Sequence, residues 1–149
     1  MATPVEALAE RFHQDIFQQG EFSVADEIVA PDFTWHATDL PPRLPKGPTG
    51  VKQMAAMFRQ AFPDLKITHE DVIACGDKVV IRWRMTGSHD GEYLGVTPTG
   101  RPIDVSGIGI FRVAGDKLAE LWTNMDDLGL EQQIDALPTL EEVLGHLPS

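Results

Sequence analysis

A carboxylate and two histidines stand where the sequence could support acid–base chemistry. Asp126 follows Trp122 by four residues near the end of an alternating segment, and His36 and His89 lie at the ends of two other such segments. A carboxylate whose pKa is raised by an apolar wall can take a proton from carbon and return it to oxygen. A histidine can donate a hydrogen bond to a developing oxyanion. These residue types are those of an acid–base enzyme.

The sequence carries no motif for a metal or an organic cofactor. None of the five histidines has a second His or Cys at a spacing that would fix a metal site. The GVTPTG loop is not a phosphate-binding motif. We therefore expect no bound metal, flavin or nicotinamide. The single cysteine, Cys75, cannot form an internal disulfide, which suits a reducing compartment, and we expect it to be a small buried residue.

Composition and charge exclude several classes of protein. The 149 residues, 42% apolar and 23% charged, are typical of one globular domain with a single core. The apolar runs are too short to span a membrane and the first residues do not resemble a signal peptide, so we expect a cytoplasmic protein. With 12 Lys and Arg against 23 Asp and Glu, the net charge of −11 makes nucleic acid and membranes poor partners.

Two periodicities divide the chain into helices and strands. Apolar residues three or four apart predict helices over 4–19 and 50–62, with a short helix after Ser23 and a strand at 32–37 between them. Alternation predicts four long strands, at 66–75, 78–88, 103–113 and 117–126. Loops rich in proline and glycine cover 39–50 and 91–102, and further helices are predicted at 128–136 and after Pro138. Helices followed by antiparallel strands indicate an α+β domain, in which a curved sheet can leave a pocket against the long helix.

The alternation within 78–88 separates a pocket face from an outer face. The apolar residues of this strand share one face with His89: Val79, Ile81, Trp83 and Met85. Side chains alternate across a strand, so Arg82 and Arg84 lie on the other face. We assign the apolar face to the pocket.

The same argument leaves two interpretations of 117–126 open. Either Leu121 and Met125 belong to the core and Asp126 lies in water, or Trp122 and Asp126 face the pocket and the aliphatic face meets a partner subunit. Glycines at positions 107 and 109 lend some support to the second interpretation, because glycine within a strand often marks room left for a ligand.

Three segments together resemble a known family: AFPDL (61–65), GDKVVIRWRMTGSHDGEYLGVTPTGR (76–101) and DKLAELWTNMDDLGLEQQI (116–134). They are similar to the SnoaL-like polyketide cyclases, also called ester cyclases, of the nuclear-transport-factor-2-like superfamily. The resemblance runs in register from about residue 5 to residue 134. It implies a single domain over 1–149 with a cone-shaped α+β barrel, in which the curved sheet wraps around the N-terminal helices and an internal pocket.

The resemblance also implies an activity and places residues in it. It implies a cofactor-independent cyclase of antibiotic biosynthesis that closes a ring in a polyketide intermediate by intramolecular aldol condensation, with Asp126 as the acid/base. Asp127 does not fit the spacing and is expected in the first turn of the next helix. His36 stands where the steroid isomerases of the superfamily carry their catalytic aspartate, and it either assists catalysis or is satisfied at a strand edge. His89 either orients the substrate or caps the loop.

A flat polycarbonyl substrate suits broad, polarisable side chains. The expected substrate-binding residues are Trp35, Phe58, Trp83, Met85, His89, Phe111, Trp122 and Asn124. Asn124 has the alternative of a hydrogen bond to the C-terminal helix. Glu120 shares the face of Trp122 but comes early in the strand, so we expect it to form a peripheral salt bridge.

Two alternative functions use the same pocket. A dehydratase or isomerase would employ His36, His89 and Asp126, whereas a non-catalytic binder of a hydrophobic small molecule has no need of a carboxylate buried among aromatic rings. We also expect a homodimer or tetramer formed through the outer sheet face, because that face would mix aliphatic side chains with arginines. Its predicted members are Arg82, Arg84, Ile108, Ile110, Arg112, Leu121 and Met125.

Overall fold

A computed structural model describes residues 4–38 and 40–145. The helices are α1 (Pro4–Arg11), the π-helix η1 (Phe12–Gln18), α2 (Val24–Ile28), α3 (Pro48–Ala61), α4 (Asp127–Gln133) and α5 (Leu140–Gly145). The strands are β1 (Val29–His36), β2 (Lys66–Cys75), β3 (Lys78–Ser88), β4 (Pro102–Ala114) and β5 (Lys117–Met125). The predicted α+β class is confirmed. Among the described helices, none is long and apolar enough to cross a membrane.

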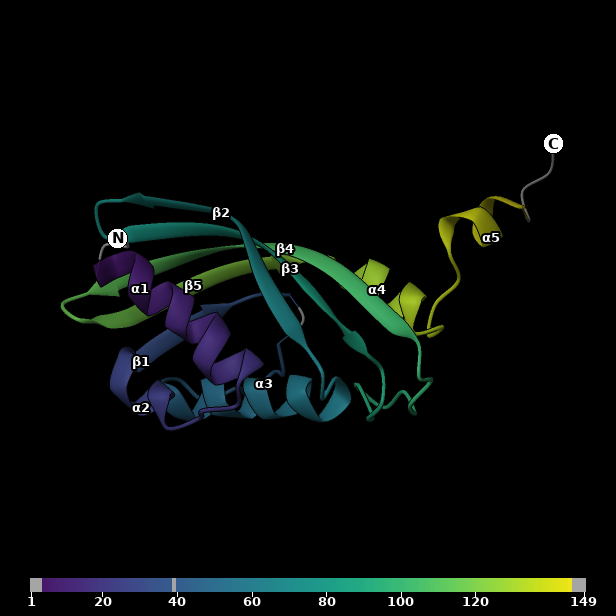
Figure 1. The fold of residues 1–149 in the computed structure, drawn as a ribbon, viewed down its shortest axis with the longest axis horizontal. Helices are drawn as coiled ribbons and strands as arrows, with labels where there is room; N and C mark the ends of the chain where they lie inside the picture. Colours follow the sequence, from purple (N-terminus) through teal and green to yellow (C-terminus); the bar gives the residue numbers. More distant parts are fainter. Residues whose placement is uncertain (1–3, 39, 146–149) are drawn as a thin grey trace.

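The five strands form one open, curved sheet in the order β1-β5-β4-β3-β2. Strands β2 to β5 pair antiparallel, and β1 adds to β5 in parallel. Figure 1 shows the sheet arching over α1 and α3, while α5 extends away from the rest of the molecule. Helix α4 packs near the start of β4, where the side-chain amide of Gln133 bonds both backbone groups of Asp104.

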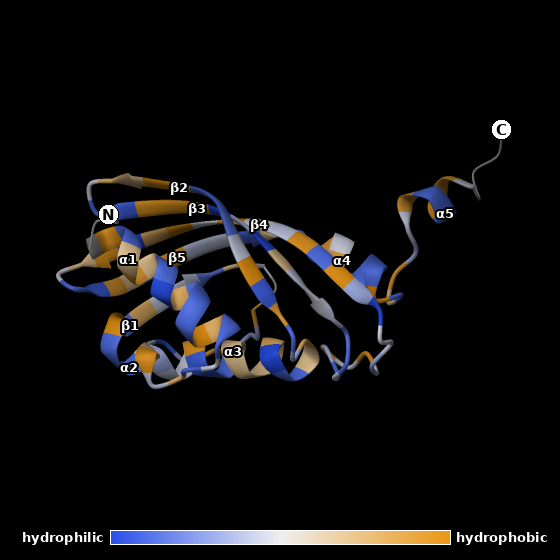
Figure 2. Cartoon of the chain, viewed as in Figure 1, coloured by the Kyte–Doolittle hydropathy of each residue, from blue (hydrophilic) through white to orange (hydrophobic). Residues whose placement is uncertain are grey.

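The core lies between the concave face of the sheet and the helices beneath it. Apolar and polar residues alternate along the strands in Figure 2, and the apolar ones on the concave face are buried. Trp83 and Met85 of β3 are only 7% and 4% exposed, and they face a helical layer that includes Phe12 and Met54. Removal of this apolar surface from water is the main force that holds the sheet on the helices.

The first predicted helix, 4–19, is divided into two kinds of helix. After α1 the backbone widens into η1, and the N–H of Gln19 bonds the carbonyl of Gln14 five residues earlier. A wider turn lets adjacent residues share a face. Four residues of η1 are therefore buried together: Phe12, His13, Ile16 and Phe17.

A β-bulge in β5 changes the faces of its second half. Val113 lies opposite Leu118, but Arg112 lies opposite Glu120, so Ala119 is one residue in excess. Because side chains alternate, one extra residue moves every residue beyond it to the other face of the sheet.

A second β-bulge lies in the edge strand β2. Asp71 is opposite Arg82, but His69 is opposite Trp83, which leaves Glu70 in excess. In a regular ladder Glu70 would lie opposite Trp83, and His69 would lie opposite Arg84 on the outer face. The bulge instead turns His69 toward the concave side, next to Trp83.

Candidate functional site

The concave face of the sheet and the helices enclose an inner pocket. Its cavity volume is about 50 Å³, and the empty space between its lining residues, open solvent at the mouth included, is about 540 Å³. Its wall is mostly aromatic and aliphatic: Phe12, His13, Phe17, Trp35, Ala37, Leu40, Met54, Phe58, Ile67, Trp83, Met85, Thr123 and Met125. A mostly apolar wall with few polar groups is typical of small-molecule sites.

A second concavity, here called the outer groove, lies on the opposite face of the sheet. It is lined by His36, Ala37, Thr38, Arg82, Ser106, Gly107, Ile108, Ile110, Trp122, Thr123, Asn124, Met125 and Asp126. Ala37, Thr123 and Met125 line both the groove and the inner pocket. Strand β1 ends at His36, opposite Trp122, and so leaves the edge of β5 uncovered beyond that point. The pocket and the groove therefore meet at the end of β1.

One polar residue of the pocket wall, His13, is in contact with a second histidine, His69. Nδ1 of His13 lies 2.9 Å from Nε2 of His69. His13 is 8% exposed, and burial lowers its pKa from 6.5 to about 3, with a smaller contribution from the neighbouring His69. Burial also lowers the pKa of the half-buried His69. Both imidazoles are therefore neutral at pH 7.

Two glutamines of η1 hold this pair in place. The side chain of Gln14 donates to the carbonyl of Ile67, and that of Gln18 accepts from the Ile67 N–H, each at 2.9 Å. At the end of η1, the guanidinium of Arg59 donates to the carbonyls of Phe17 and Gln18. The π-helix is thus fastened to strand β2 two residues before His69.

Trp83 contributes a polar atom next to the histidines. Its indole centroid lies 6.0 Å from that of His13, and within the described part of the chain its buried Nε1 has no hydrogen-bond partner. An unpaired buried donor is costly, and an oxygen of a bound molecule would satisfy it.

Thr123 is the third polar residue of the pocket. Its Oγ1 accepts a hydrogen bond from Nε1 of Trp35 at 3.2 Å. This contact joins β5 to β1 and fixes the indole of Trp35 in the wall. Trp35 and Thr123 are both half-buried near the place where the pocket meets the outer groove.

Four of the predicted substrate-binding residues line the inner pocket: Trp35, Phe58, Trp83 and Met85. Phe111 is fully buried behind the wall, where its ring lies 5.0 Å from Phe12 and 5.7 Å from His13. Substrate contact by these residues stays a prediction.

Of the two interpretations of β5, the one that places Trp122 and Asp126 in the pocket is wrong. Trp122, Asn124 and Asp126 line the outer groove, and Leu121 and Met125 face inward. The bulge at Ala119 is the reason, because it reverses the faces that a regular hairpin would give. The interpretation with Leu121 and Met125 inside and Asp126 in water is the correct one.

Asp126 has a structural role where it stands. It is exposed and precedes α4 as its N-cap, and its Oδ1 accepts a hydrogen bond from the Gly129 N–H at 2.9 Å. Such a bond satisfies one of the free N–H groups of the first turn. Asp127 begins α4, as predicted. The expected place of Asp126 in a closed pocket is therefore wrong.

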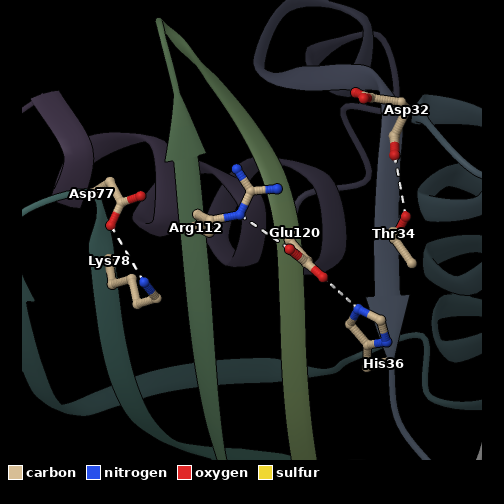
Figure 3. A network of polar contacts seen from close by, with 7 residues as sticks. All are labelled: Asp32, Thr34, His36, Asp77, Lys78, Arg112 and Glu120. Atoms are coloured by element: carbon tan, nitrogen blue, oxygen red, sulfur yellow. Dashed lines mark hydrogen bonds and ion pairs between the residues drawn. The ribbon is translucent and has the colours of Figure 1, made fainter.

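His36 also lies on the outer face and not in the pocket. Its Nε2 is 2.7 Å from Oε2 of Glu120, and its ring stacks on Trp122 at 5.3 Å between centroids. Figure 3 shows His36 and Arg112 reaching Glu120 from opposite sides, with Arg112 Nε 3.0 Å from Oε1. The bond to His36 and then that to Arg112 lower the pKa of Glu120. The predicted peripheral salt bridge of Glu120 is confirmed.

His89 holds a loop together. Its ring is fully buried, with Nδ1 2.9 Å from Thr99 Oγ1, and its backbone bonds Gly100 and Arg101. The loop-capping interpretation is therefore the correct one, and His89 is not part of the pocket wall.

Two smaller expectations are wrong. The space beside Gly107 is filled by Trp83, and that beside Gly109 by Leu121, so neither glycine leaves room for a ligand. Cys75 is exposed at the β2–β3 turn.

Within residues 4–38 and 40–145, no group of three or more His, Cys, Asp or Glu is arranged to hold a metal ion.

Sequence reasoning missed His13 and His69 as site residues. They are 56 residues apart, and backbone irregularities that a regular period does not predict bring them into contact, with His13 in the pocket wall. The sequence shows that Thr123 and Met125 share one face of the strand. It does not show the bulge that turns this face inward.

The comparisons with known proteins agree with this architecture. The family profile described as SnoaL-like polyketide cyclase matches residues 7–134. TsrD from Streptomyces laurentii is 28% identical with a TM-score of 0.79, over 90% of this chain and 96% of that one. A protein from Acidithiobacillus ferrooxidans assigned as a polyketide cyclase is 27% identical with a TM-score of 0.81, over 91% and 96% of the two chains.

A third structure, from Bacillus cereus and also assigned as a polyketide cyclase, is 31% identical with a TM-score of 0.77, over 91% of this chain and 83% of that one. No curated protein matches the chain. The shared architecture is the nuclear-transport-factor-2-like fold. Since the matched segment spans most of the chain, the protein belongs to the SnoaL-like polyketide cyclase family.

Proposed function

We propose that this protein is a cofactor-independent cyclase that closes a ring in a polyketide-like, polycarbonyl substrate held in the inner pocket. The observation that carries the proposal is the pocket of a SnoaL-like chain with an aromatic and aliphatic wall. That wall is interrupted by only a few polar side chains, His13, Thr123 and the indoles among them. Broad apolar surfaces bind flat ring systems, and few polar groups suffice to orient carbonyl oxygens.

The reaction that we propose is an intramolecular aldol-type closure. It needs a base to remove a proton beside a carbonyl, a donor to stabilise the enolate oxygen, and an acid to protonate the new alkoxide. Folding a flexible chain into reactive geometry supplies a further part of the acceleration. A pocket with a bent sheet as one wall suits the folding of a flexible substrate.

The sequence-based hypothesis assigns the proton transfers to Asp126, with help from His36. Both side chains lie on the outer side of the sheet, where Asp126 is exposed to solvent. A substrate would have to extend past Ala37 to reach them. The inner pocket has a titratable side chain of its own in His13, so cyclisation in the pocket does not require Asp126.

The test is turnover of linear polycarbonyl methyl esters by the purified protein, followed by liquid chromatography and mass spectrometry. Ring closure gives a product of unchanged mass, or one water lighter after dehydration. Ala37→Trp at the meeting point of pocket and groove should abolish turnover, whereas Ala114→Trp at the exposed β4–β5 turn should not. Absence of any cyclised product, or full activity of Ala37→Trp, would contradict the proposal.

The two alternative functions fare differently. A dehydratase or isomerase was expected to use His36, His89 and Asp126 in the inner pocket, but His36 and Asp126 line the outer groove and His89 is buried in the loop that it holds. A non-catalytic binder remains compatible with an apolar pocket. Saturable binding of the ester without any change in its mass would favour the binder.

We further propose that the protein forms a homodimer or a dimer of dimers through the outer sheet face. Support comes from the exposed apolar side chains on this face, Ile108 at 49% and Trp122 at 37%. The arginines beside them are already paired within the chain, as in Arg82 with Asp71. Leu121 points inward and is not part of that face, and Met125 lines both the inner pocket and the outer groove.

A further inference from the structure

We propose, on the basis of the proposed function, that His13 is the residue that removes and returns the proton in the inner pocket. His69 is its positioning partner and accepts part of the charge that His13 acquires. Neither histidine is assigned a role by the family resemblance or by the sequence motifs. The inference is drawn from the arrangement of the two imidazoles and the pocket wall.

Two independent backbone irregularities converge on this pair. The π-turn of η1 buries His13 beside Phe12, and the bulge at Glu70 turns His69 to the same side of the sheet. Each irregularity weakens a regular hydrogen-bond pattern, and such features are frequent where a side chain must be aimed at a site. Their meeting point is the 2.9 Å contact between His13 Nδ1 and His69 Nε2.

The geometry leaves one nitrogen of His13 for a bound molecule. Nδ1 is engaged with His69, and the imidazole lines the pocket. Nε2 has no hydrogen-bond partner in the described part of the chain, yet it is not among the fully buried unpaired atoms. It is therefore the atom that a substrate in the pocket would meet.

His69 makes up for the low basicity of the buried His13. The pKa of His13, lowered to about 3, makes its isolated imidazole a weak base, because a positive charge there is poorly solvated. His69 is only half-buried, so the charge is better solvated on its ring. Passing the shared proton from His13 to His69 moves the charge outward and makes the pair a stronger base than His13 alone.

The proton transfers balance as follows. The active tautomer has the shared proton on His13 Nδ1 and a lone pair on His13 Nε2. Nε2 takes the proton from the carbon beside the carbonyl, and the electrons of that C–H bond form the enolate. The Nδ1 proton shifts to His69, which carries the charge. After the enolate carbon attacks the second carbonyl, both shifts reverse and Nε2 gives its proton to the new alkoxide.

Trp83 supplies the donor that the enolate needs. Its buried Nε1 has no partner among the described residues, and its ring packs against His13 at 6.0 Å. Because Nε1 is fully buried, the ring must move slightly toward the pocket before a carbonyl oxygen can accept from it, and the carbon beside that carbonyl would then lie near the imidazole. The hydrogen bond strengthens as negative charge develops on the oxygen.

A base in an apolar pocket can be tested with a probe that is independent of the natural substrate. In 5-nitrobenzisoxazole, removal of the C3 proton breaks the N–O bond and releases a coloured nitrophenolate. The wild-type protein should exceed free imidazole at equal concentration. His13→Gln should lower kcat/KM by roughly 100-fold or more, as loss of a general base does. Thr68→Val, on the exposed outer face of β2 beside His69, is the matched control.

The role of His69 is tested by a pair of variants at a half-buried position. His69→Leu should lower kcat with little effect on KM and should shift the pH profile of kcat, because it removes the acceptor of the shared proton. His69→Gln keeps a hydrogen-bonding side chain and should restore part of the rate. Circular dichroism of each variant establishes that it is folded. If His13→Gln does not fold, the His69 pair still decides the question.

The outcomes separate this inference from the proposed function. Equal rates for wild type, His13→Gln and His69→Leu, or a wild-type rate no higher than that of imidazole, would overturn the role of the histidine pair. Cyclisation of polycarbonyl esters that survives both substitutions would overturn it as well and leave the proposed function intact. If both variants lose turnover of the probe and the wild-type protein cyclises no ester, the result supports the histidine base and refutes the proposed cyclase function.

Discussion

The indole of Trp83 lies across Gly107, its direct neighbour on the next strand. The two residues are paired in the β3–β4 ladder, and a Cβ on Gly107 would lie 2.2 Å from Cζ2 of Trp83. Two further ring atoms of Trp83 would lie within 2.6 Å of it. Glycine at 107 is thus what leaves room for the indole of Trp83 in the pocket wall.

Gly107→Ala should therefore destabilise the protein and move Trp83. A clash with a rigid ring in the core costs about 1–3 kcal/mol of unfolding free energy. Gly109→Ala is the matched control in the same strand, because its Cβ would meet only the end of Leu121, at 3.3 Å. Urea unfolding of the two variants checks the prediction, and equal stabilities would contradict it.

The limits of sequence reasoning are clear in the two hairpins. The bounds of β2 and β3 follow from alternation and from Gly76, whose φ of +60° suits the tight turn. The faces of β5 do not follow from alternation. A hairpin that turns at Gly115 without a bulge would place Trp122 inward, and the single extra residue Ala119 reverses this. Nothing in the residue types of the strand marks the position of the bulge.

The pocket residues on the helices show the same limit. Phe12 falls on the 3.6-residue stripe of the predicted helix and is buried as that stripe predicts. His13 is its neighbour and reaches the same face only because η1 is a π-helix. The aromatic wall could thus be predicted from periodicity, whereas the polar group within it could not.

The pH dependence of stability should reveal the buried imidazole of His13. Its pKa in the folded state is about 3, below the unfolded value of 6.5, so between these values the unfolded chain binds the proton and the folded chain does not. The unfolding free energy should therefore fall as the pH is lowered from 6.5, with a slope of up to about 1.4 kcal/mol per pH unit from this group. His69, whose pKa is lowered in the same direction, adds to the effect.

Urea unfolding between pH 6.5 and 5 measures this slope before most carboxylates titrate. In His13→Phe the contribution of His13 is absent, and the slope should be clearly smaller than in the wild type. Identical slopes in the two proteins would mean that the pKa of His13 is the same in the folded and the unfolded chain. That result would contradict the desolvated environment of His13 from which the catalytic inference is argued.

Asp126 should behave as a helix cap. Asp126→Ala loses the bond to the Gly129 N–H and should cost about 1 kcal/mol of unfolding free energy, whereas asparagine at the same position caps about as well as aspartate. Thermal unfolding of the two variants measures this. Turnover distinguishes a cap from an acid/base. If Asp126 is the acid/base, both the alanine and the asparagine variant lose activity. If Asp126 is only a cap, the asparagine variant keeps its activity and its stability.

The outer face should bring two copies of the chain together. Ile108, Ile110 and Trp122 lie side by side across β4 and β5, and the charged side chains around them are paired internally, as in Arg84 with Asp104. Paired charges allow two such faces to approach in spite of the net charge of −11, and contact would remove the exposed aliphatic area from water. Light scattering at micromolar concentration should give the mass of a dimer or tetramer. Ile108→Glu places an unpaired carboxylate at the centre of the contact and should yield monomers, whereas Ile73→Glu on the edge strand β2 should not. A monomeric wild type would show that this face is solvent-exposed in solution and that its apolar side chains serve another purpose.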